Sequence, residues 1–451
     1  MKNQEINILL GGKIRVSKLV VPFELKDKIY RDLTFDNPKF SKTREMGFRT
    51  VGIPENIRLI TYDGSDLLLP IGYYPRLVAH LRAADIRFQV NDQRVAPPIG
   101  GTMTVRGQLY GYQEKALADL LRFPTGVLEG VTGCGKTNIL LSAAARLGTR
   151  ALILVHSKEL LAQMAERCRT WLDYDPGVVG AGQERVKAVT VGMIQTLSRR
   201  DLGRLGRSFG AVLTDEVHHI AAETWIKVVE SFHSRYKYGF SGTAWRKDGL
   251  TPLIYMTTGY KTATITREEC QNAGKIVPAK VEVLETSYFY DINSSNEWGA
   301  MLADLVENPK RNQLIAAEAA RRLQAGSRVL ILSDRIQHCE TLGALMADGA
   351  KVVLHGRLTP KEREARMAAV RQGARLTIST YSLFGEGVDV PALDVLLFAS
   401  PISKGTRVLQ SLGRVVRSAT GKVSATVVDF VDVRVDFLVK AARGRHQLLT
   451  S

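Results

Sequence analysis

A glycine-rich run between an apolar segment and a helical pattern is the feature that most constrains the fold. Residues 130–137 are Gly-Val-Thr-Gly-Cys-Gly-Lys-Thr, which matches the pattern G-x-x-x-x-G-K-[ST]. The apolar pair Val127 and Leu128 precedes the run, and a helical pattern from Lys136 to Leu147 follows it. A strand, a tight glycine loop and a helix in this order predict an α/β domain whose loop surrounds phosphate oxygens with backbone N–H groups.

The loop side chains have distinct expected roles. Lys136 is expected to hold the β- and γ-phosphates of a nucleoside triphosphate, and Thr137 to place its hydroxyl on Mg²⁺. A glycine-rich turn with a chance lysine is the alternative, and the strand–loop–helix setting argues against it. The other residues expected to line the phosphates are Gly130, Thr132, Gly133, Cys134 and Gly135.

Two adjacent acids end another apolar segment, Ala211 to Thr214. Asp215 and Glu216 are expected at the carboxyl edge of a sheet, where open α/β sheets bind ligands. Asp215 would support Mg²⁺, and Glu216 would orient and deprotonate the water that attacks the γ-phosphate. An isolated Asp-Glu pair is more often a solvated strand end, but its position about 80 residues after the phosphate loop favours the catalytic interpretation.

The composition narrows the range of expected binding partners. The 451 residues include 62 Lys+Arg and 45 Asp+Glu, a formal net charge of +17, which favours a polyanionic partner: nucleic acid first, an acidic membrane surface second. A surplus that serves only solubility is the alternative. The four cysteines lie far apart without a C-x-x-C pair, which predicts neither a zinc site nor a disulfide framework. No stretch approaches 18 apolar residues, so we expect a cytoplasmic chain without membrane spans. We also expect a monomer.

Strand-like and helical patterns alternate twice along the chain, which predicts two tandem α/β domains. We expect a first α/β domain at 101–260, a linker at 261–300 and a second α/β domain at 301–451. Residues 1–100 carry 16 basic and 11 acidic side chains and end at the Pro- and Gly-rich segment 97–101, so they are expected to form a small α+β accessory domain.

The motifs occur in a known order. A phosphate loop, then Asp215-Glu216-Val217-His218, then Gln410-Ser411-Leu412-Gly413-Arg414-Val415-Val416-Arg417 resembles the superfamily 2 helicases and translocases over residues 106–430. The resemblance implies two RecA-like (P-loop NTPase) domains that hydrolyse ATP with Mg²⁺ and act on nucleic acid. Ala244, Ser411 and Gly111 depart from residues common in the family, which leaves the coupling residues less certain than the phosphate and magnesium ligands.

The same resemblance assigns further roles, residue by residue. Gln113 would contact adenine, and Gly387 and Asp389 would sense ATP. His218, Ser241, Thr243 and Gln410 would couple hydrolysis to movement. The residues expected to contact the nucleic-acid backbone are Ser157, Lys158, Thr196, His355, Gly356 and Thr380.

Arg417 and Arg414 are the expected arginine finger and its partner. Residues at positions i and i+3 share one face of a helix. A finger that reaches the γ-phosphate increases the rate by about 10³ to 10⁵, which is roughly 4 to 7 kcal/mol of barrier. A solvated basic helix face is the alternative, and the matching positions of Gln410 and Gly413 argue against it.

Residues 240–249 and 308–312 resemble the DNA repair and recombination branch, which includes the XPB-like, RecG-like and phage UvsW-like enzymes. That resemblance implies forked or branched DNA as the partner and suggests a phage-encoded protein in a host cytoplasm. An RNA-directed enzyme, the motor of a restriction system and an inactive binding module remain alternatives. The accessory domain would add a basic patch for duplex DNA, made by Lys39, Lys42, Arg44 and Arg49.

Overall fold

The computed structural model describes residues 5–101, 103–217, 222–242, 249–291, 297–347, 351–385, 393–402 and 405–450. The chain forms two compact units. Unit 1 consists of residues 1–130 and 135–265, and unit 2 consists of residues 131–134 and 266–451. Each unit has its own sheets and hydrophobic core.

Unit 1 begins with an accessory module built on a five-stranded sheet. Alternate residues of the strands at 6–10 and 13–17 are buried, as in a sheet with one covered face, and Ile6, Ile8 and Ile14 point into that core. The helices are α1 (Phe23–Asp32) and α3 (Tyr74–Ala83), with a 3₁₀ turn η1 (Ile71–Tyr73). The strands, in their order across the sheet, are β5 (Thr61–Asp63), β6 (Asp66–Pro70), β2 (Lys13–Ser17), β1 (Ile6–Leu10) and β7 (Phe88–Asp92).

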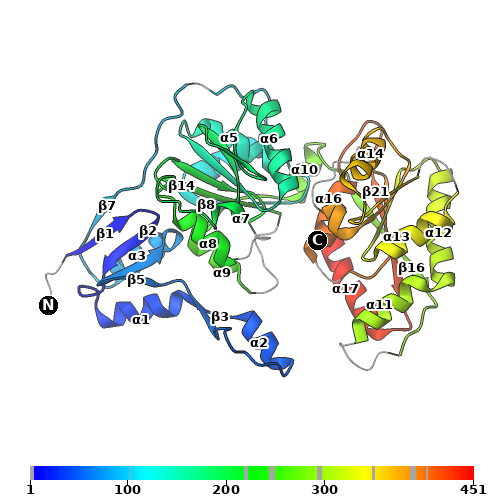
Figure 1. Cartoon of the computed structure of the whole chain (residues 1–451), viewed down its shortest axis with the longest axis horizontal. Helices are drawn as coiled ribbons and strands as arrows, with labels where there is room; N and C mark the ends of the chain where they lie inside the picture. Colours follow the sequence, from blue (N-terminus) through cyan, green and yellow to red (C-terminus); the bar gives the residue numbers. More distant parts are fainter. Residues whose placement is uncertain are drawn as a thin grey trace. The chain divides into compact units, whose positions relative to one another are not determined.

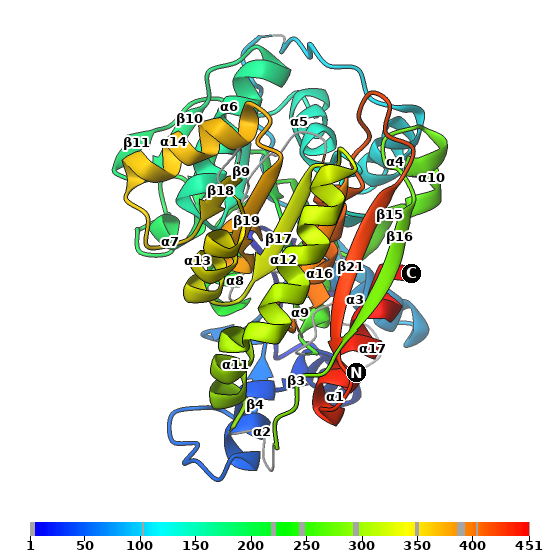
Figure 2. The ribbon, with the colours of Figure 1, turned by 90° about the vertical axis from the view of Figure 1, so that its right-hand side faces the viewer.

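A short ribbon leaves this module between α1 and β5. It consists of β3 (Thr34–Asp36) and β4 (Asn56–Arg58), which pair antiparallel, and it carries helix α2 (Pro38–Glu45). Figures 1 and 2 both place α2 beyond the ends of this ribbon, away from the five-stranded sheet.

The rest of unit 1 is an eight-stranded sheet that is parallel except for the β10–β11 pair. Central strands such as β9 are buried on both faces, which is typical of parallel sheets covered by helices. In order, the strands are β11 (Gln183–Arg185), β10 (Gly177–Gly180), β12 (Val189–Met193), β9 (Ala151–Val155), β13 (Ala211–Thr214), β14 (Tyr236–Ser241), β8 (Thr125–Gly130) and β15 (Lys261–Ile265). The helices are α4 (Gly111–Leu121), α5 (Lys136–Arg146), α6 (Lys158–Leu172), α7 (Ile194–Leu197), α8 (Ala222–Glu230) and α9 (Thr251–Thr258).

The accessory module and this larger sheet share one hydrophobic core. Gly12 lies so close to α8 that a Cβ atom there would be 2.1 Å from the carbonyl oxygen of Glu230. The buried Lys237 Nζ donates hydrogen bonds to the carbonyls of Gly12 (3.0 Å) and Val229 (2.9 Å), and burial lowers its pKa to about 7. Lys13 also forms an ion pair with Glu230 at 2.7 Å. The module is therefore an integral part of unit 1.

Unit 2 is a six-stranded, entirely parallel sheet with helices on both faces. Helices α12 and α13 lie in front of it in Figure 2, and α16 lies behind. The strands, in order, are β16 (Ala279–Thr286), β21 (Ala425–Asp432), β20 (Val395–Phe398), β17 (Val329–Ser333), β19 (Leu376–Thr380) and β18 (Lys351–Leu354). The helices are α10 (Arg267–Asn272), α11 (Trp298–Glu307), α12 (Pro309–Gln324), α13 (Ile336–Leu345), α14 (Pro360–Arg371), α15 (Tyr381–Gly385), α16 (Gly405–Val415) and α17 (Asp436–Thr450).

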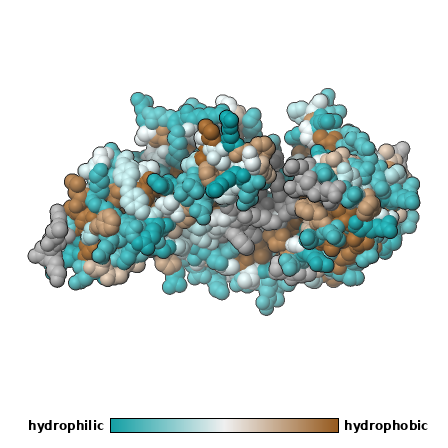
Figure 3. Space-filling view, turned by 90° about the horizontal axis from the view of Figure 1, so that it is seen from below, coloured by the Kyte–Doolittle hydropathy of each residue, from teal (hydrophilic) through white to brown (hydrophobic). Residues whose placement is uncertain are grey.

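The predicted fold class, two tandem RecA-like domains with an N-terminal α+β segment, is confirmed. The domain boundaries stay predictions. Hydrophilic residues cover much of the face seen in Figure 3. Within the described ranges, every helix is too short or too polar to cross a lipid bilayer.

Candidate functional site

The glycine-rich loop joins β8 to the N-terminus of α5, as the sequence predicts. Gly133 and Gly135 have φ values of +93° and +83°, a region that side chains with a Cβ rarely adopt, so glycine is required for the loop to turn here. Lys136, the first residue of α5, is buried, and its Nζ donates to the carbonyl of Gly130 at 3.0 Å. The lysine is thereby held inside the curve of the loop.

Gln113 lies beside this loop. It is buried in the first turn of α4, where its Oε1 accepts a hydrogen bond from the Tyr110 N–H at 2.9 Å. A Cβ on Gly135 would be 2.4 Å from the Gln113 Nε2, so this amide nitrogen is in contact with the phosphate loop. Gln113, the predicted adenine contact, therefore also packs against the phosphate loop.

Asp215 and Glu216 follow β13 at the carboxyl edge of the sheet. Burial, followed by the neighbouring Glu216, raises the pKa of Asp215 to about 7, while Lys136 acts in the opposite direction. Glu216 adopts a left-handed φ of +48°, which is unusual for a residue with a side chain, and its N–H donates to Asp215 Oδ1 at 3.0 Å. Crowded carboxylates beside a lysine favour a cation at this edge, and carboxylate and hydroxyl oxygens from Asp215 and Thr137 suit Mg²⁺.

Two predicted nucleic-acid segments of unit 1 meet at the ends of neighbouring strands. β9 and β12 pair in register, so His156, which follows β9, lies beside the residues that follow β12. Gln195, which precedes the predicted contact Thr196 in the same segment, donates its Nε2 hydrogen to the carbonyl of His156 at 2.8 Å. Ser157 caps α6 by accepting the Leu160 N–H at 3.2 Å, and Lys158 is exposed next to it, while Thr196 is part of α7.

The corresponding segments of unit 2 also share one edge. β18 and β19 pair with Leu354 opposite Ser379, which places His355 and Thr380 at neighbouring strand ends. His355 is buried, which lowers its pKa, and its Nε2 lies 3.5 Å from the Glu340 carboxylate. Gly356 is exposed beyond it.

Two segments of the chain match known protein families. Residues 106–246 match the family described as "Type III restriction enzyme, res subunit", and residues 310–419 match "Helicase conserved C-terminal domain". The chain carries the two domains of a superfamily 2 helicase.

Relatives of this helicase occur in viruses and archaea. It is 28% identical over 371 residues to "Probable helicase D10" of Escherichia phage T5, covering 78% of this chain and 77% of that protein. It is 27% identical over 350 residues to "DNA 3'-5' translocase XPB2" of Sulfurisphaera tokodaii, covering 69% and 79%. Its fold is similar to that of S. cerevisiae Dbp5 bound to RNA and ADP BeF3, with a TM-score of 0.55, 16% identity and coverage of 76% and 88%.

The arginines of the helicase's last motif differ from one expectation. Helix α16 ends at Val415, and Arg417 instead forms an antiparallel bridge with Ile276, next to the Val277 N–H to Val416 carbonyl bond of 2.8 Å. The prediction that Arg414 and Arg417 share one helical face is therefore wrong, because this backbone pairing ends the helix between them. The guanidinium of Arg414 lies 5.4 Å from the centre of the Phe384 ring, and Gln410 is inside α16.

Four predicted site residues lie outside the described part of the helicase: His218, Thr243, Gly387 and Asp389. Ser241 is described, and it is buried at the end of β14. Among the described residues, no group of three or more His, Cys, Asp or Glu side chains is arranged to hold a metal ion.

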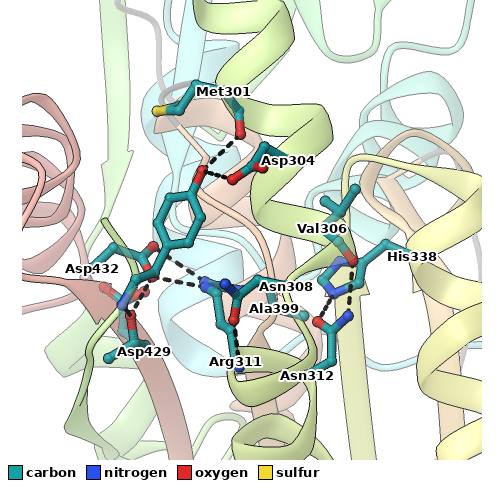
Figure 4. Close-up of polar contacts among 12 residues, drawn as sticks. Met301, Asp304, Val306, Asn308, Arg311, Asn312, His338, Ala399, Asp429 and Asp432 are labelled. Carbon is teal, nitrogen blue, oxygen red and sulfur yellow. Dashed lines mark hydrogen bonds and ion pairs between the residues drawn. The ribbon is translucent and has the colours of Figure 1, made fainter. Parts of the chain in front are cut away.

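Sequence reasoning missed a buried ionic network at the carboxyl edge of the unit 2 sheet. Arg311, in the first turn of α12, donates from Nε to Asp432 Oδ1 at 2.8 Å and also bonds the carbonyl of Ala399 (Figure 4). The hydroxyl of Thr286, at the end of β16, bonds the same aspartate. A second buried pair joins Arg445 to Asp429 at 2.9 Å.

A histidine completes this network. The ring of His338 contacts Ser333 Oγ and Asn312 Oδ1, both at 2.8 Å, and burial together with the nearby Arg311 lowers its pKa to about 3. Asn308 caps α12 by accepting the Arg311 N–H at 3.0 Å. The sequence Asn308-Pro309 predicts that cap, but nothing in the sequence signals a pairing between residues 311 and 432.

Proposed function

We propose that this helicase is an ATP-dependent DNA helicase or translocase that unwinds or branch-migrates forked and junction DNA. The observation that supports it is the convergence of Lys136, Asp215 and Glu216 at one sheet edge in a chain that carries both helicase domains. ATP hydrolysis is the chemistry that such an edge suits, because phosphoryl transfer rewards positioning and charge neutralisation.

The residues divide the work. Lys136 and the glycine loop bind and orient the phosphates, and Thr137 and Asp215 would hold Mg²⁺, which supplies charge neutralisation when bound. Glu216 accepts a proton from the attacking water, and its backbone is held in the left-handed conformation with its N–H on Asp215 Oδ1. Arg414 and Arg417 stabilise the charge that develops on the transferred phosphoryl group.

Nucleic acid binds along the two strand-end edges. Ser157, Lys158 and Thr196 of unit 1, and His355, Gly356 and Thr380 of unit 2, contact the sugar-phosphate backbone. His218, Ser241, Thr243 and Gln410 couple hydrolysis to movement, with Gly387 and Asp389 sensing the nucleotide. Alternating approach and separation of the two grips would move the protein along one strand.

DNA is the favoured partner because the archaeal relative is named as a DNA translocase. The net charge of +17 suits a polyphosphate of either kind, DNA or RNA. We propose roles in replication, recombination or repair, in the cytoplasm of a phage host. An RNA-directed enzyme is the second candidate, since the fold is shared with an RNA-bound structure, and the restriction-enzyme family match also suggests a restriction motor.

One screen of ATPase activity tests these candidate functions. ATPase rates of the full chain with Mg²⁺ are measured with single-stranded, duplex, forked and four-way DNA and with single-stranded RNA, using Lys136→Ala as the inactive control. We expect the largest stimulation by forked and four-way DNA. Stronger stimulation by RNA would establish the second candidate, equal stimulation by plain duplex would favour a restriction motor, and no hydrolysis would leave a binding module.

A further inference from the structure

Residues 37–55, which connect β3 to β4 and which we call the arm, have an unusual local structure. Its helix α2 has no buried residue, although most helices of globular proteins are stabilised by burying one face. A helix without a fully buried residue needs other support and leaves most of its surface to solvent.

That support lies at the base of the arm. Asn37 is buried, accepts the Lys39 N–H at 3.1 Å as the cap of α2 and donates its Nδ2 hydrogen to the carbonyl of Pro54 at 2.7 Å. The Asn37 N–H also bonds the carbonyl of Glu55 at 2.9 Å, so one residue joins both ends of the arm. Pro38 at the first helical position further favours the helix.

The tip is ordered by its own backbone. After α2, the N–H groups of Gly47 and Phe48 bond the carbonyls of Arg44 and Thr43, both at 3.0 Å. Gly47 and Gly52 have φ values of +73° and +78°, the left-handed conformation that tight turns use. The tip therefore holds its shape without packing against the rest of the chain.

The tip presents apolar side chains to water. Met46, Phe48 and Val51 are 56%, 68% and 88% exposed, three of the most exposed large apolar residues in the described chain, within six positions. Scattered exposed apolar residues are normal, but a group on a protruding segment marks an interaction site.

The flanks of the tip are cationic. Lys39, Lys42, Arg44 and Arg49 are all exposed, and none forms an ion pair within the described part of the chain. By contrast, Arg15, Arg76 and Arg94 of the same module pair with nearby aspartates. The arm thus combines free positive charge with an apolar end.

We propose that the arm docks on the duplex at a DNA branch point, with its four cations on phosphates and Phe48 stacked on the terminal base pair. This proposal rests on the proposed function. At a branch point, as at a duplex end, a base-pair face is open to an aromatic ring. The four basic residues lie within nine positions of Phe48 and can then meet the flanking phosphates. Stacking needs no base sequence, so the arm recognises structure.

The test measures binding without nucleotide. A fork carrying 2-aminopurine in the terminal base pair is titrated with the full chain, and stacking by Phe48 should change its fluorescence. Phe48→Ala should abolish that change and weaken fork binding by about 5- to 150-fold, whereas Phe48→Trp should restore both. Point variants are used because deleting the accessory module would expose the core that it shares with unit 1.

The cations have a separate readout. Replacing Lys39, Lys42, Arg44 and Arg49 by alanine should reduce the slope of log K against log salt on duplex by up to about 3.6, at 0.9 per phosphate contact. The matched control replaces four other cations of the module, which are Lys26, Lys28, Arg82 and Arg87. A second control, Phe23→Ala, removes an aromatic residue of α1 that is 83% exposed.

Failure of this proposal is distinguishable from failure of the proposed function. ATP hydrolysis by the parental protein with single-stranded DNA tests the motor on its own, with Lys136→Ala as the inactive control. No 2-aminopurine response in the parental protein, or equal fork affinity for Phe48→Ala and Phe23→Ala, would overturn the arm proposal even if the motor is active. A salt slope lowered as much by the control cations would do the same.

Discussion

The carboxyl edges of the large sheets of unit 1 and unit 2 are both formed by the ends of parallel strands, but they carry different arrangements of charged side chains. In unit 1, the strand ends hold a glycine loop, one lysine and two adjacent carboxylates, and Asp215 has a raised pKa because it is buried beside Glu216. In unit 2, the ends of β16, β21, β20 and β17 are joined by Arg311, Asp432, Thr286 and their partners (Figure 4). One edge concentrates like charge, and the other pairs each buried aspartate with an arginine.

The contrast fits the proposal of a nucleotide site at one edge and a closed edge at the other. A buried carboxylate costs free energy unless a cation or hydrogen bonds compensate it. Unit 2 supplies that compensation from its own arginines, which stabilises its structure. In unit 1, the buried Asp215 lies beside a second carboxylate, which fits the proposed Mg²⁺ and nucleotide, so substitutions should affect activity at the first edge and stability at the second.

The largest expected effect is at the unit 1 edge. Glu216→Gln should retain nucleotide binding but lower ATP turnover by about 10³-fold or more, since the amide cannot accept the water's proton. Lys136→Ala should also weaken nucleotide binding, because it removes the phosphate ligand. Steady-state hydrolysis and equilibrium binding of a fluorescent ATP analogue separate the two variants, and parental turnover in Glu216→Gln would show that another group is the base.

Breaking the unit 2 edge should cost stability instead. Arg311→Met leaves Asp432 buried without its cation, which should destabilise unit 2 by about 3 to 5 kcal/mol. Urea unfolding of the full chain, followed by hydrogen exchange in peptides from β17 and β21, reports on this unit.

The matched control changes both partners. Arg311→Met with Asp432→Asn removes the charge pair while keeping an acceptor for Thr286, so it should recover much of the lost stability. If the double variant is as unstable as Arg311→Met, packing of the arginine, and not an unpaired charge, determines the effect.

The two edges also differ in how well the sequence predicts them. Lys136, Asp215 and Glu216 were predicted because the loop pattern and the strand-end acids are local signals, each contained in a few residues. Arg311 and Asp432 are 121 positions apart, and their pairing depends on the first turn of α12 lying at the end of β21, which no single segment encodes. The sharing of one core by the accessory module and α8 was missed for the same reason.

Local reasoning failed once where a tertiary contact intervened. The i, i+3 spacing of Arg414 and Arg417 predicts one helical face, but the bridge between Ile276 and Arg417 ends the helix first. The arm shows the opposite case. Its cations were evident in the sequence, whereas the exposure of Phe48 was not, because an aromatic residue is usually buried.

A smaller effect should follow from pH at the unit 2 edge. His338 has a pKa of about 3 in the folded chain and about 6.5 when unfolded, so the unfolded state binds the proton between these values. Unit 2 should therefore lose about 2 kcal/mol of stability at pH 5 relative to pH 8. His338→Gln keeps hydrogen-bonding capacity without a titrating ring, and an equal loss in that variant would assign the dependence to other groups.

The last prediction concerns the pH dependence of stability at the unit 1 edge, which should have the opposite sign. Asp215→Asn removes one of two crowded charges and keeps the Oδ1 acceptor for the Glu216 N–H. Because the folded pKa of about 7 lies above the unfolded value, the parental protein loses stability as pH rises from about 4 to 7, and the variant does not. Without nucleotide and Mg²⁺, the variant should be more stable than the parent at pH 8, a gain that shrinks toward pH 4, even though its ATPase activity is lost. Hydrogen exchange in peptides from β13 and α5 at both pH values measures this, with Asn138→Asp as a charge control on α5. A variant less stable than the parent at pH 8 would mean that the attraction between Asp215 and Lys136 outweighs the repulsion from Glu216, and the two edges would then be alike in balancing their own charges.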